Sequence, residues 1–272
     1  MPAPSEPLLP VLALDTSTET LAAALHTGRD VFTVQVPGGA LASVALLPQL
    51  QGLLQRAGLV YADLRAIAFG RGPGAFTGLR TACAVAQGLG FGLDRPLLPL
   101  DSLLIVAEDA RMQLGAGDGF ELAVAMDARI QEIYAARYGY QAGRWTVLQP
   151  PALMTLPAWA ASWADTGAEA PEPVVAGSAL VAFGDRLGLA PAVRCVATEH
   201  DRAAALLRLA VSAASADVGV DAAQALPLYL RDKVAFTTAE RDATREAARD
   251  AATRAAPGGG PAVAQLQTRV AR

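Results

Sequence analysis

A polar turn near the N-terminus carries residue types that could handle a phosphate and its metal ion. Asp15 follows an apolar run that predicts a buried strand, and the next three residues, Thr16, Ser17 and Thr18, all carry hydroxyl groups. Turns of this kind handle phosphate and metal in two-lobed proteins that hold ATP between duplicated α/β modules. The same side chains could instead satisfy the N–H groups of their own turn, and the residues alone leave both interpretations open.

A glycine-rich loop is the second candidate phosphate site. Residues 69–80 read FGRGPGAFTGLR, with four glycines and one proline between a predicted strand and a predicted helix. Glycine permits close backbone approach, and the free N–H groups at a helix start attract anions. No lysine follows Gly78, as a P-loop requires, and Thr77 stands at the third glycine of a dinucleotide fingerprint. We therefore interpret the loop as a structural scaffold and not as a nucleotide site. We expect special φ values at its glycines and a carboxylate or carbonyl that accepts a hydrogen bond from Arg80. The residues of this scaffold are Gly72, Pro73, Gly74, Phe76, Thr77, Gly78 and Arg80.

The elements around these motifs predict an α/β fold built from two related modules. Apolar strands alternate with helices along the chain. From Phe120 the N-terminal layout returns: an apolar strand, a turn at Asp127 and a second strand from Glu132. This repetition predicts an internal duplication. The second turn, with Asp127, Arg129 and Glu132, lacks the small hydroxyl and glycine residues that would approach a phosphate, so half of any phosphate cleft has decayed.

The pattern divides the chain into two lobes and a tail. We expect a first lobe over residues 1–106 and a second lobe over 107–200. A C-terminal helix at about 201–236 is expected to pack back on the first lobe. Residues 237–272 change to alanine, arginine and acidic residues around three consecutive glycines, which predicts a disordered tail or a peripheral helix.

Composition excludes several classes of protein. The 272 residues carry a formal charge of −4, which argues against unaided binding of nucleic acid through a broad basic face. The two histidines, His26 and His200, are isolated, so we expect no metal site, and neither a metalloprotease nor a nucleophilic triad is supported. Cys83 and Cys195 predict buried, reduced thiols. With no signal peptide and no apolar run of membrane-spanning length, we expect a cytoplasmic protein without a membrane partner.

Four segments together resemble the TsaB (YeaZ) family. They are LALDTSTETLAAAL, AFGRGPGAFTGLRTACAVAQGLGFGL, MDARIQEIYAARY and LPLYLRDKVAF, and the resemblance covers residues 8–236. It implies a two-lobed, actin-like or Hsp70-like ATPase fold. It also implies a place in the machinery that puts threonylcarbamoyl on the adenosine beside the anticodon of tRNA. The chain departs from the family at Ala42, where a histidine is usual.

The resemblance implies a dimerisation subunit without catalytic residues. Its expected partners are a TsaD-type catalytic paralogue and a TsaE-type ATPase, with tRNA reached only through the complex and a homodimer left open for the chain alone. Helices at 41–57 and 76–93 could form a four-helix interface with the paralogue. Core packing is the alternative role of these helices, and our interface candidates are Leu46, Leu50, Leu53, Ala82, Ala86 and Leu89.

Two other functions stay as alternatives. An ATP-dependent phosphotransferase of the sugar-kinase type would need a second acidic turn with glycine, which the turn at Asp127 lacks. A glycoprotease-like peptidase is disfavoured by the absence of paired histidines. We expect no cofactor; weak nucleotide binding, or a nucleotide site shared with the partner, stays open.

Overall fold

The computed structural model describes residues 9–166, 173–216 and 218–231, and every statement below concerns these residues. They belong to the first of two compact units into which the chain divides, Met1–Arg231 and Asp232–Arg272. The predicted tail at 237–272 lies outside the described residues. None of the described helices is long and apolar enough to cross a membrane.

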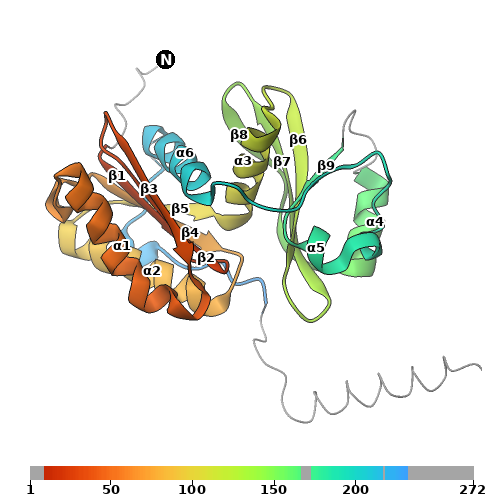
Figure 1. Cartoon of the computed structure of the whole chain (residues 1–272), viewed down its shortest axis with the longest axis horizontal. Coiled ribbons are helices and arrows are strands. Elements are labelled where there is room, and N and C mark those ends of the chain that lie inside the picture. Colours follow the sequence, from red (N-terminus) through yellow and green to blue (C-terminus); the bar gives the residue numbers. More distant parts are fainter. Residues whose placement is uncertain (1–8, 167–172, 217, 232–272) are drawn as a thin grey trace, which may run out of the picture. The chain divides into compact units, whose positions relative to one another are not determined.

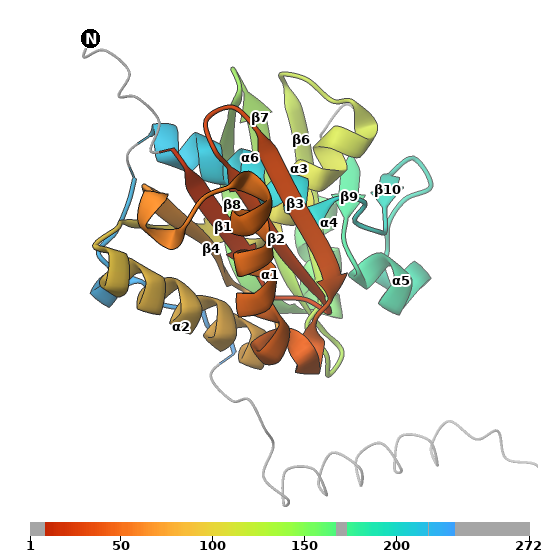
Figure 2. The same cartoon turned by 60° about the vertical axis from the view of Figure 1, so that its left-hand side comes forward.

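The first lobe is a five-stranded sheet with helices on both faces (Figure 1). Its strands, in spatial order, are β3 (Val31–Pro37), β2 (Thr20–His26), β1 (Val11–Asp15), β4 (Ala66–Gly72) and β5 (Leu97–Asp101). One face is covered by α1 (Ala42–Ala57) and α2 (Phe76–Leu93), which Figure 2 shows side by side, and the other by α6 (Arg202–Ser215). The short helices are η1 (Gly39–Leu41) and η2 (Tyr61–Asp63).

The two faces of this sheet differ in side-chain size. In β1, Leu12 and Leu14 point toward α1 and α2, whereas Val11 and Ala13 point toward α6. Successive side chains of a strand alternate between faces, so a buried strand needs apolar residues on both. The α6 face is lined largely by alanines, which allow the helix to pack close to the sheet; they are Ala13, Ala22, Ala24, Ala66 and Ala68.

The second lobe repeats this plan. Its sheet has the order β10 (Arg194–Val196), β9 (Val174–Ala176), β6 (Phe120–Asp127), β7 (Glu132–Gln141), β8 (Arg144–Thr155). It packs against α3 (Ser102–Leu114) on one face and against α4 (Leu156–Thr166) and α5 (Ala179–Phe183) on the other. The 3-10 helix η3 (Gly184–Leu187) follows α5. In each lobe an antiparallel three-strand meander is extended by two parallel strands, so the predicted α/β duplication is confirmed.

Helices α3 and α6 connect the lobes. Each packs on the sheet of one lobe, and the two helices contact each other. Glu108 on α3 is buried and pairs with Arg208 on α6 at 3.1 Å. It also accepts a hydrogen bond from Trp145 Nε1 on β8 at 3.0 Å. A single carboxylate thus ties both helices to the second sheet.

Two expectations need correction here. The C-terminal helix expected at about 201–236 ends at Ser215, and the chain then runs through η4 (Ala222–Gln224) along the side of α2. Carbonyl groups of residues 222 and 225 accept hydrogen bonds from Gln87 of α2, which hold this segment against α2. Cys195 is exposed because it lies on an edge strand, whereas Cys83 is buried as expected.

The interface candidates were chosen from the wrong face of α1 and α2. Five of them, Leu46, Leu50, Leu53, Ala82 and Ala86, are buried in the core against the first sheet. Leu89 is half-buried beside the same core. A sheet buried on both faces draws the largest apolar residues of each covering helix inward, so these side chains are not available to a partner.

We expect Leu50→Ala to destabilise the chain by about 2–5 kcal/mol, because it removes fully buried methyl groups and leaves a cavity. Leu47→Ala is the matched control on the same helix; its side chain is 49% exposed, and we expect a loss below about 1 kcal/mol. Urea unfolding of both variants measures the difference. Equal losses would show that α1 does not pack as described.

Candidate functional site

The carboxylate of Asp15 is fully buried and accepts four hydrogen bonds from the chain. Its Oδ1 accepts bonds from the backbone N of Ser17 at 3.1 Å, from Ser17 Oγ at 2.9 Å and from Arg202 Nε at 3.0 Å. Its Oδ2 accepts a bond from Ser102 Oγ at 3.1 Å. The end of β1, the start of α3 and the start of α6 therefore meet at one carboxylate.

Arg202 supplies the positive charge of this cluster. Its side chain is 1% exposed and forms ion pairs with Asp15 and Glu199. Nη2 donates to Ser17 Oγ at 2.9 Å. Burial alone would lower the pKa of Arg202, but the charges and hydrogen bonds of Asp15 and Glu199 raise it overall, so the guanidinium stays protonated.

Sequence reasoning missed Arg202. One feature could have revealed it: the arginine follows the N-cap Asp201 and so begins a helix. A positive charge there opposes the helix dipole. Such a residue at the start of an alanine-rich helix indicates a carboxylate partner elsewhere in the fold.

The glycine loop packs against the backbone of the Asp15 turn. The N–H of Ala75 donates to the carbonyl of Ser17 at 2.7 Å, and Thr16 Oγ1 donates to the carbonyl of Gly78 at 2.7 Å. A Cβ on Gly74 would lie 2.4 Å from the Ser17 oxygen, and one on Gly78 would lie 1.8 Å from the Thr16 oxygen. The start of α2 thus contacts protein backbone where an anion would otherwise bind.

The expectation of special φ values holds at Gly72 alone among these loop glycines. Gly72 has φ +112°, whereas Gly74 and Gly78 do not have a positive φ. Glycine is needed at the latter two positions because the backbones touch, not because of φ.

Thr18 serves its own turn, since its hydroxyl accepts a hydrogen bond from the N–H of Thr20 at 3.2 Å.

Among the described residues, Arg80 pairs with neither a carboxylate nor a carbonyl, contrary to expectation. Its guanidinium lies over the ring of Phe76, 3.8 Å from the centroid, and Nε donates to the hydroxyl of Tyr229 at 3.2 Å. The rings of Phe76 and Tyr229 are 4.9 Å apart. Tyr229 reaches this position because the neighbouring N–H of Leu228 donates to the carbonyl of Arg71 at 2.7 Å.

The second-lobe turn is also bound by the chain itself. Residues 129–131 all have positive φ, and the N–H of Arg129 donates to Asp127 Oδ1 at 2.8 Å. Arg231 pairs with Glu132 at 2.6 Å and donates to the carbonyl of Ala128 at 2.9 Å. Arg129 also lies 3.6 Å from Glu19 of the first lobe. Both turns therefore have their acidic groups paired with arginines.

This arrangement does not fit a nucleotide–metal complex. A carboxylate that binds a metal or its waters must present accessible oxygen atoms. Oδ1 of Asp15 already accepts three hydrogen bonds, and Oδ2, which accepts one, lies against Gly70. Within the described ranges, no group of three or more His, Cys, Asp or Glu residues could hold a metal ion.

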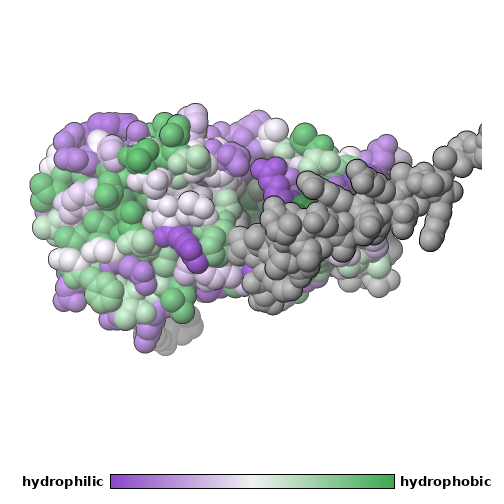
Figure 3. Space-filling view, turned by 90° about the horizontal axis from the view of Figure 1, so that it is seen from below, coloured by the Kyte–Doolittle hydropathy of each residue, from purple (hydrophilic) through white to green (hydrophobic). Residues whose placement is uncertain are grey.

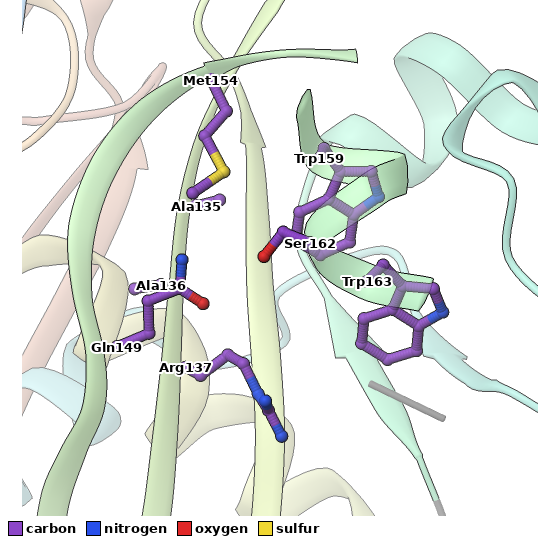
Figure 4. Close-up of a pocket in the computed structure, with 8 residues that line it drawn as sticks. All are labelled: Ala135, Ala136, Arg137, Gln149, Met154, Trp159, Ser162 and Trp163. Atoms are coloured by element: carbon purple, nitrogen blue, oxygen red, sulfur yellow. The ribbon is translucent and has the colours of Figure 1, made fainter. Parts of the chain in front are cut away.

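A small cavity lies on the outer face of the second sheet, between β7, β8 and α4 (Figure 4). Its volume is about 10 Å³, and it is lined by Ala135, Ala136, Arg137, Gln149, Met154, Trp159, Ser162 and Trp163. The two indole rings stack with centroids 5.6 Å apart. Space of this size holds a single water molecule at most, so the cavity does not admit a nucleobase or a sugar.

Comparison with known proteins places these features in a family. The family model described as "TsaD: tRNA N6-adenosine threonylcarbamoyltransferase" matches residues 40–172. The "tRNA threonylcarbamoyladenosine biosynthesis protein TsaB" of Haemophilus influenzae is 37% identical over 126 residues, which are 46% of this chain and 52% of that protein. Its Escherichia coli namesake is 35% identical over 128 residues, 47% of this chain and 54% of that one. The chain thus matches about half the length of these curated relatives.

Solved structures extend the match over a whole relative. A structure of YeaZ from Pseudomonas aeruginosa is 37% identical with a TM-score of 0.70, and the alignment covers 81% of this chain and 99% of that one. The chain belongs to the TsaB (YeaZ) family. A second crystal structure, of an uncharacterized protein described as similar to peptidase YEAZ from Pseudomonas aeruginosa, has the same identity and coverage and a TM-score of 0.72. The resemblance drawn from the four motifs is confirmed, and with it the α/β fold built on two five-stranded sheets.

We expect Gly78→Ala to cost at least about 1–3 kcal/mol of stability, because the new methyl group meets the backbone oxygen of Thr16. On the same helix, a Cβ added to Gly88 would meet no atom within 4 Å, so we expect Gly88→Ala to stabilise the chain by about 0.5–1 kcal/mol through helix propensity. Thermal unfolding distinguishes the two. A neutral Gly78→Ala variant would contradict the close contact.

We expect Arg202→Met to destabilise the chain by about 3–5 kcal/mol, since it leaves Asp15 and Glu199 buried without their cation. The double variant Asp15→Asn with Arg202→Met should lose less than the sum of the single variants. Arg208→Met is the control on the same helix; that arginine is 44% exposed, and we expect a loss of about 1 kcal/mol or less. Additive single losses in denaturant unfolding would show that the pair is not coupled.

Proposed function

We propose that this chain is a non-catalytic subunit of the machinery that transfers a threonylcarbamoyl group to the adenosine adjacent to the anticodon of tRNA. Its membership of the TsaB (YeaZ) family carries this proposal, together with the names of its H. influenzae and E. coli relatives. In this role it pairs with a TsaD-type catalytic paralogue and activates it. The match of residues 40–172 to the TsaD model supports a common fold for the two partners.

The burial of Asp15 and its pairing with Arg202 support a role without catalysis. A catalytic carboxylate must reach substrate, metal or water, and Asp15 is 0% exposed with its oxygens engaged by Arg202 and two serines. The acidic residue Glu132 of the second turn is engaged by Arg231. An autonomous phosphotransferase would need these groups free.

The outer faces of α1 and α2 offer a surface for the paralogue. On α1, Val44 is 70% exposed and Leu47 is 49% exposed, and Leu41 just before the helix is exposed as well. On α2, Phe91 is 64% exposed, and the small residues Ala84 and Gly88 lie open to solvent beside it. Figure 3 shows apolar side chains spread over the face of the first lobe that is seen from below.

A partner of the same fold can meet this surface with its own two helices. Small residues let helix backbones approach closely, and the exposed Val, Leu and Phe side chains supply the apolar area of a four-helix interface. A TsaE-type ATPase joins the pair, and tRNA is reached through the complex, in keeping with the chain's net charge of −4. Without its paralogue, the same surface allows a homodimer.

The proposal is tested by mixing the purified chain with its TsaD-type paralogue and measuring threonylcarbamoyladenosine, with each protein alone as control. We expect product from the mixture only and no ATPase activity from the chain alone. ATP turnover by the isolated chain that disappears in Asp15→Ala would contradict the proposal.

We expect Val44→Arg and Ala84→Arg to weaken pairing at least about tenfold, equivalent to about 1.4 kcal/mol, because each places a charge in the interface. Their urea unfolding should stay within about 1 kcal/mol of the parent, since both sites are exposed. Val181→Arg on α5 is the control, because its side chain is 73% exposed in the other lobe. Pairing is measured by calorimetry. Unchanged affinity in both first-lobe variants would show that the interface does not lie on the outer faces of α1 and α2.

A further inference from the structure

Arg80 is an exposed cation that is held in place without a carboxylate. Its guanidinium stacks on Phe76 and donates one hydrogen bond, from Nε to Tyr229 Oη. In the described part of the chain its Nη groups have no ion-pair or hydrogen-bond partner. As far as the described residues go, the two Nη groups can bind a further group.

The surroundings restrict the side chain before any partner binds. Phe76 begins α2, and Tyr229 is fixed through Leu228 and through Gln87, whose amide donates to the carbonyl of Ala225 at 2.9 Å. An arginine usually loses much side-chain entropy when it binds. Here stacking on Phe76 and the hydrogen bond to Tyr229 already restrict the side chain, so Arg80 loses less side-chain entropy when it binds.

The position of Arg80 joins it to the proposed partner surface. Thr77, Arg80, Ala84, Gly88 and Phe91 follow each other at intervals of three and four residues and are all exposed. Residues at this spacing lie on one face of a helix. Tyr229, 41% exposed, extends the same region beside the start of α2, where its ring contacts Phe76.

We propose that Arg80 is the charged anchor of the partner surface and binds an Asp or Glu carboxylate of the TsaD-type paralogue through its two Nη groups. This inference rests on the proposed function. Arginine beside tyrosine in an otherwise apolar surface is the composition of interface hot spots. A carboxylate matches the paired donors of a guanidinium in geometry and charge.

An RNA phosphate fits this place less well than a carboxylate. Arg80 is the only charged residue among the five exposed residues of this α2 face, and its neighbours are small or apolar. Binding of RNA through phosphates draws its affinity from several cations together. Binding of a single carboxylate on a partner protein, in contrast, needs only one cation.

The test is the affinity of the full chain for the purified paralogue at low and high salt, with four variants. We expect Arg80→Ala to weaken binding about 10- to 100-fold at low salt and less at high salt, and Arg80→Glu to weaken it further. Arg80→Lys should fall between the parent and Arg80→Ala, since lysine keeps the charge but loses the paired donors. Tyr229→Phe should have a smaller effect, because it removes one hydrogen bond and keeps the ring.

Arg186→Ala is the matched control. Arg186 also lies over a phenylalanine, Phe183, and also donates to a polar side chain, Gln131, but it belongs to the second lobe. We expect the Arg186→Ala variant to bind the paralogue with the affinity of the parent chain. Every variant should have an unfolding temperature within a few degrees of the parent's.

The outcomes separate the two proposals. If the parent chain does not bind the paralogue, the proposed function fails. If the parent binds and Arg80→Ala binds equally well at low salt, only the role of Arg80 is overturned. A variant that pairs normally but lowers tRNA binding by the assembled complex would also overturn it, in favour of a phosphate contact.

Discussion

The buried charge of Asp15 is the constraint on which the rest of the structure depends. A carboxylate without solvent exposure is stable only when a cation and hydrogen-bond donors surround it. Arg202 provides the cation from 187 positions further along the chain. Removing water from this group therefore requires β1, α3 and α6 to meet at one point, and α6 must return to the first lobe after the second is complete.

The same pair decides what kind of function the fold can support. Asp15 and Glu132, the acidic groups of the two turns, are paired with the chain's own arginines and are not free to bind a ligand. The partner surface that we propose lies on the outside of the first lobe. In α2 these two roles are separated by face: Ala82 and Ala86 pack inward, and Arg80, Ala84 and Phe91 point outward.

The glycine loop links the buried cluster to the outer surface. Gly74 and Gly78 let the start of α2 rest on the backbone of Ser17 and Thr16, and Ser17 in turn binds Asp15 and Arg202. The helix that carries Arg80 is therefore anchored at its first turn by the same hydrogen-bond network that surrounds Asp15. A partner that docks on α2 meets a helix whose direction is set from within the core.

The sequence by itself determined the α/β class, the duplication, the family and the two polar turns, because apolar periodicity and glycine spacing are local properties of the chain. Only the tertiary structure decided which face of α1 and α2 is buried, since both faces carry small and apolar residues. It also decided that Arg202 neutralises Asp15, that Tyr229 receives Arg80, and that Gly74 and Gly78 serve close contact and not positive φ. Each of these depends on residues far apart in the sequence, and the pairing of distant side chains follows from packing and charge burial, which no local pattern records.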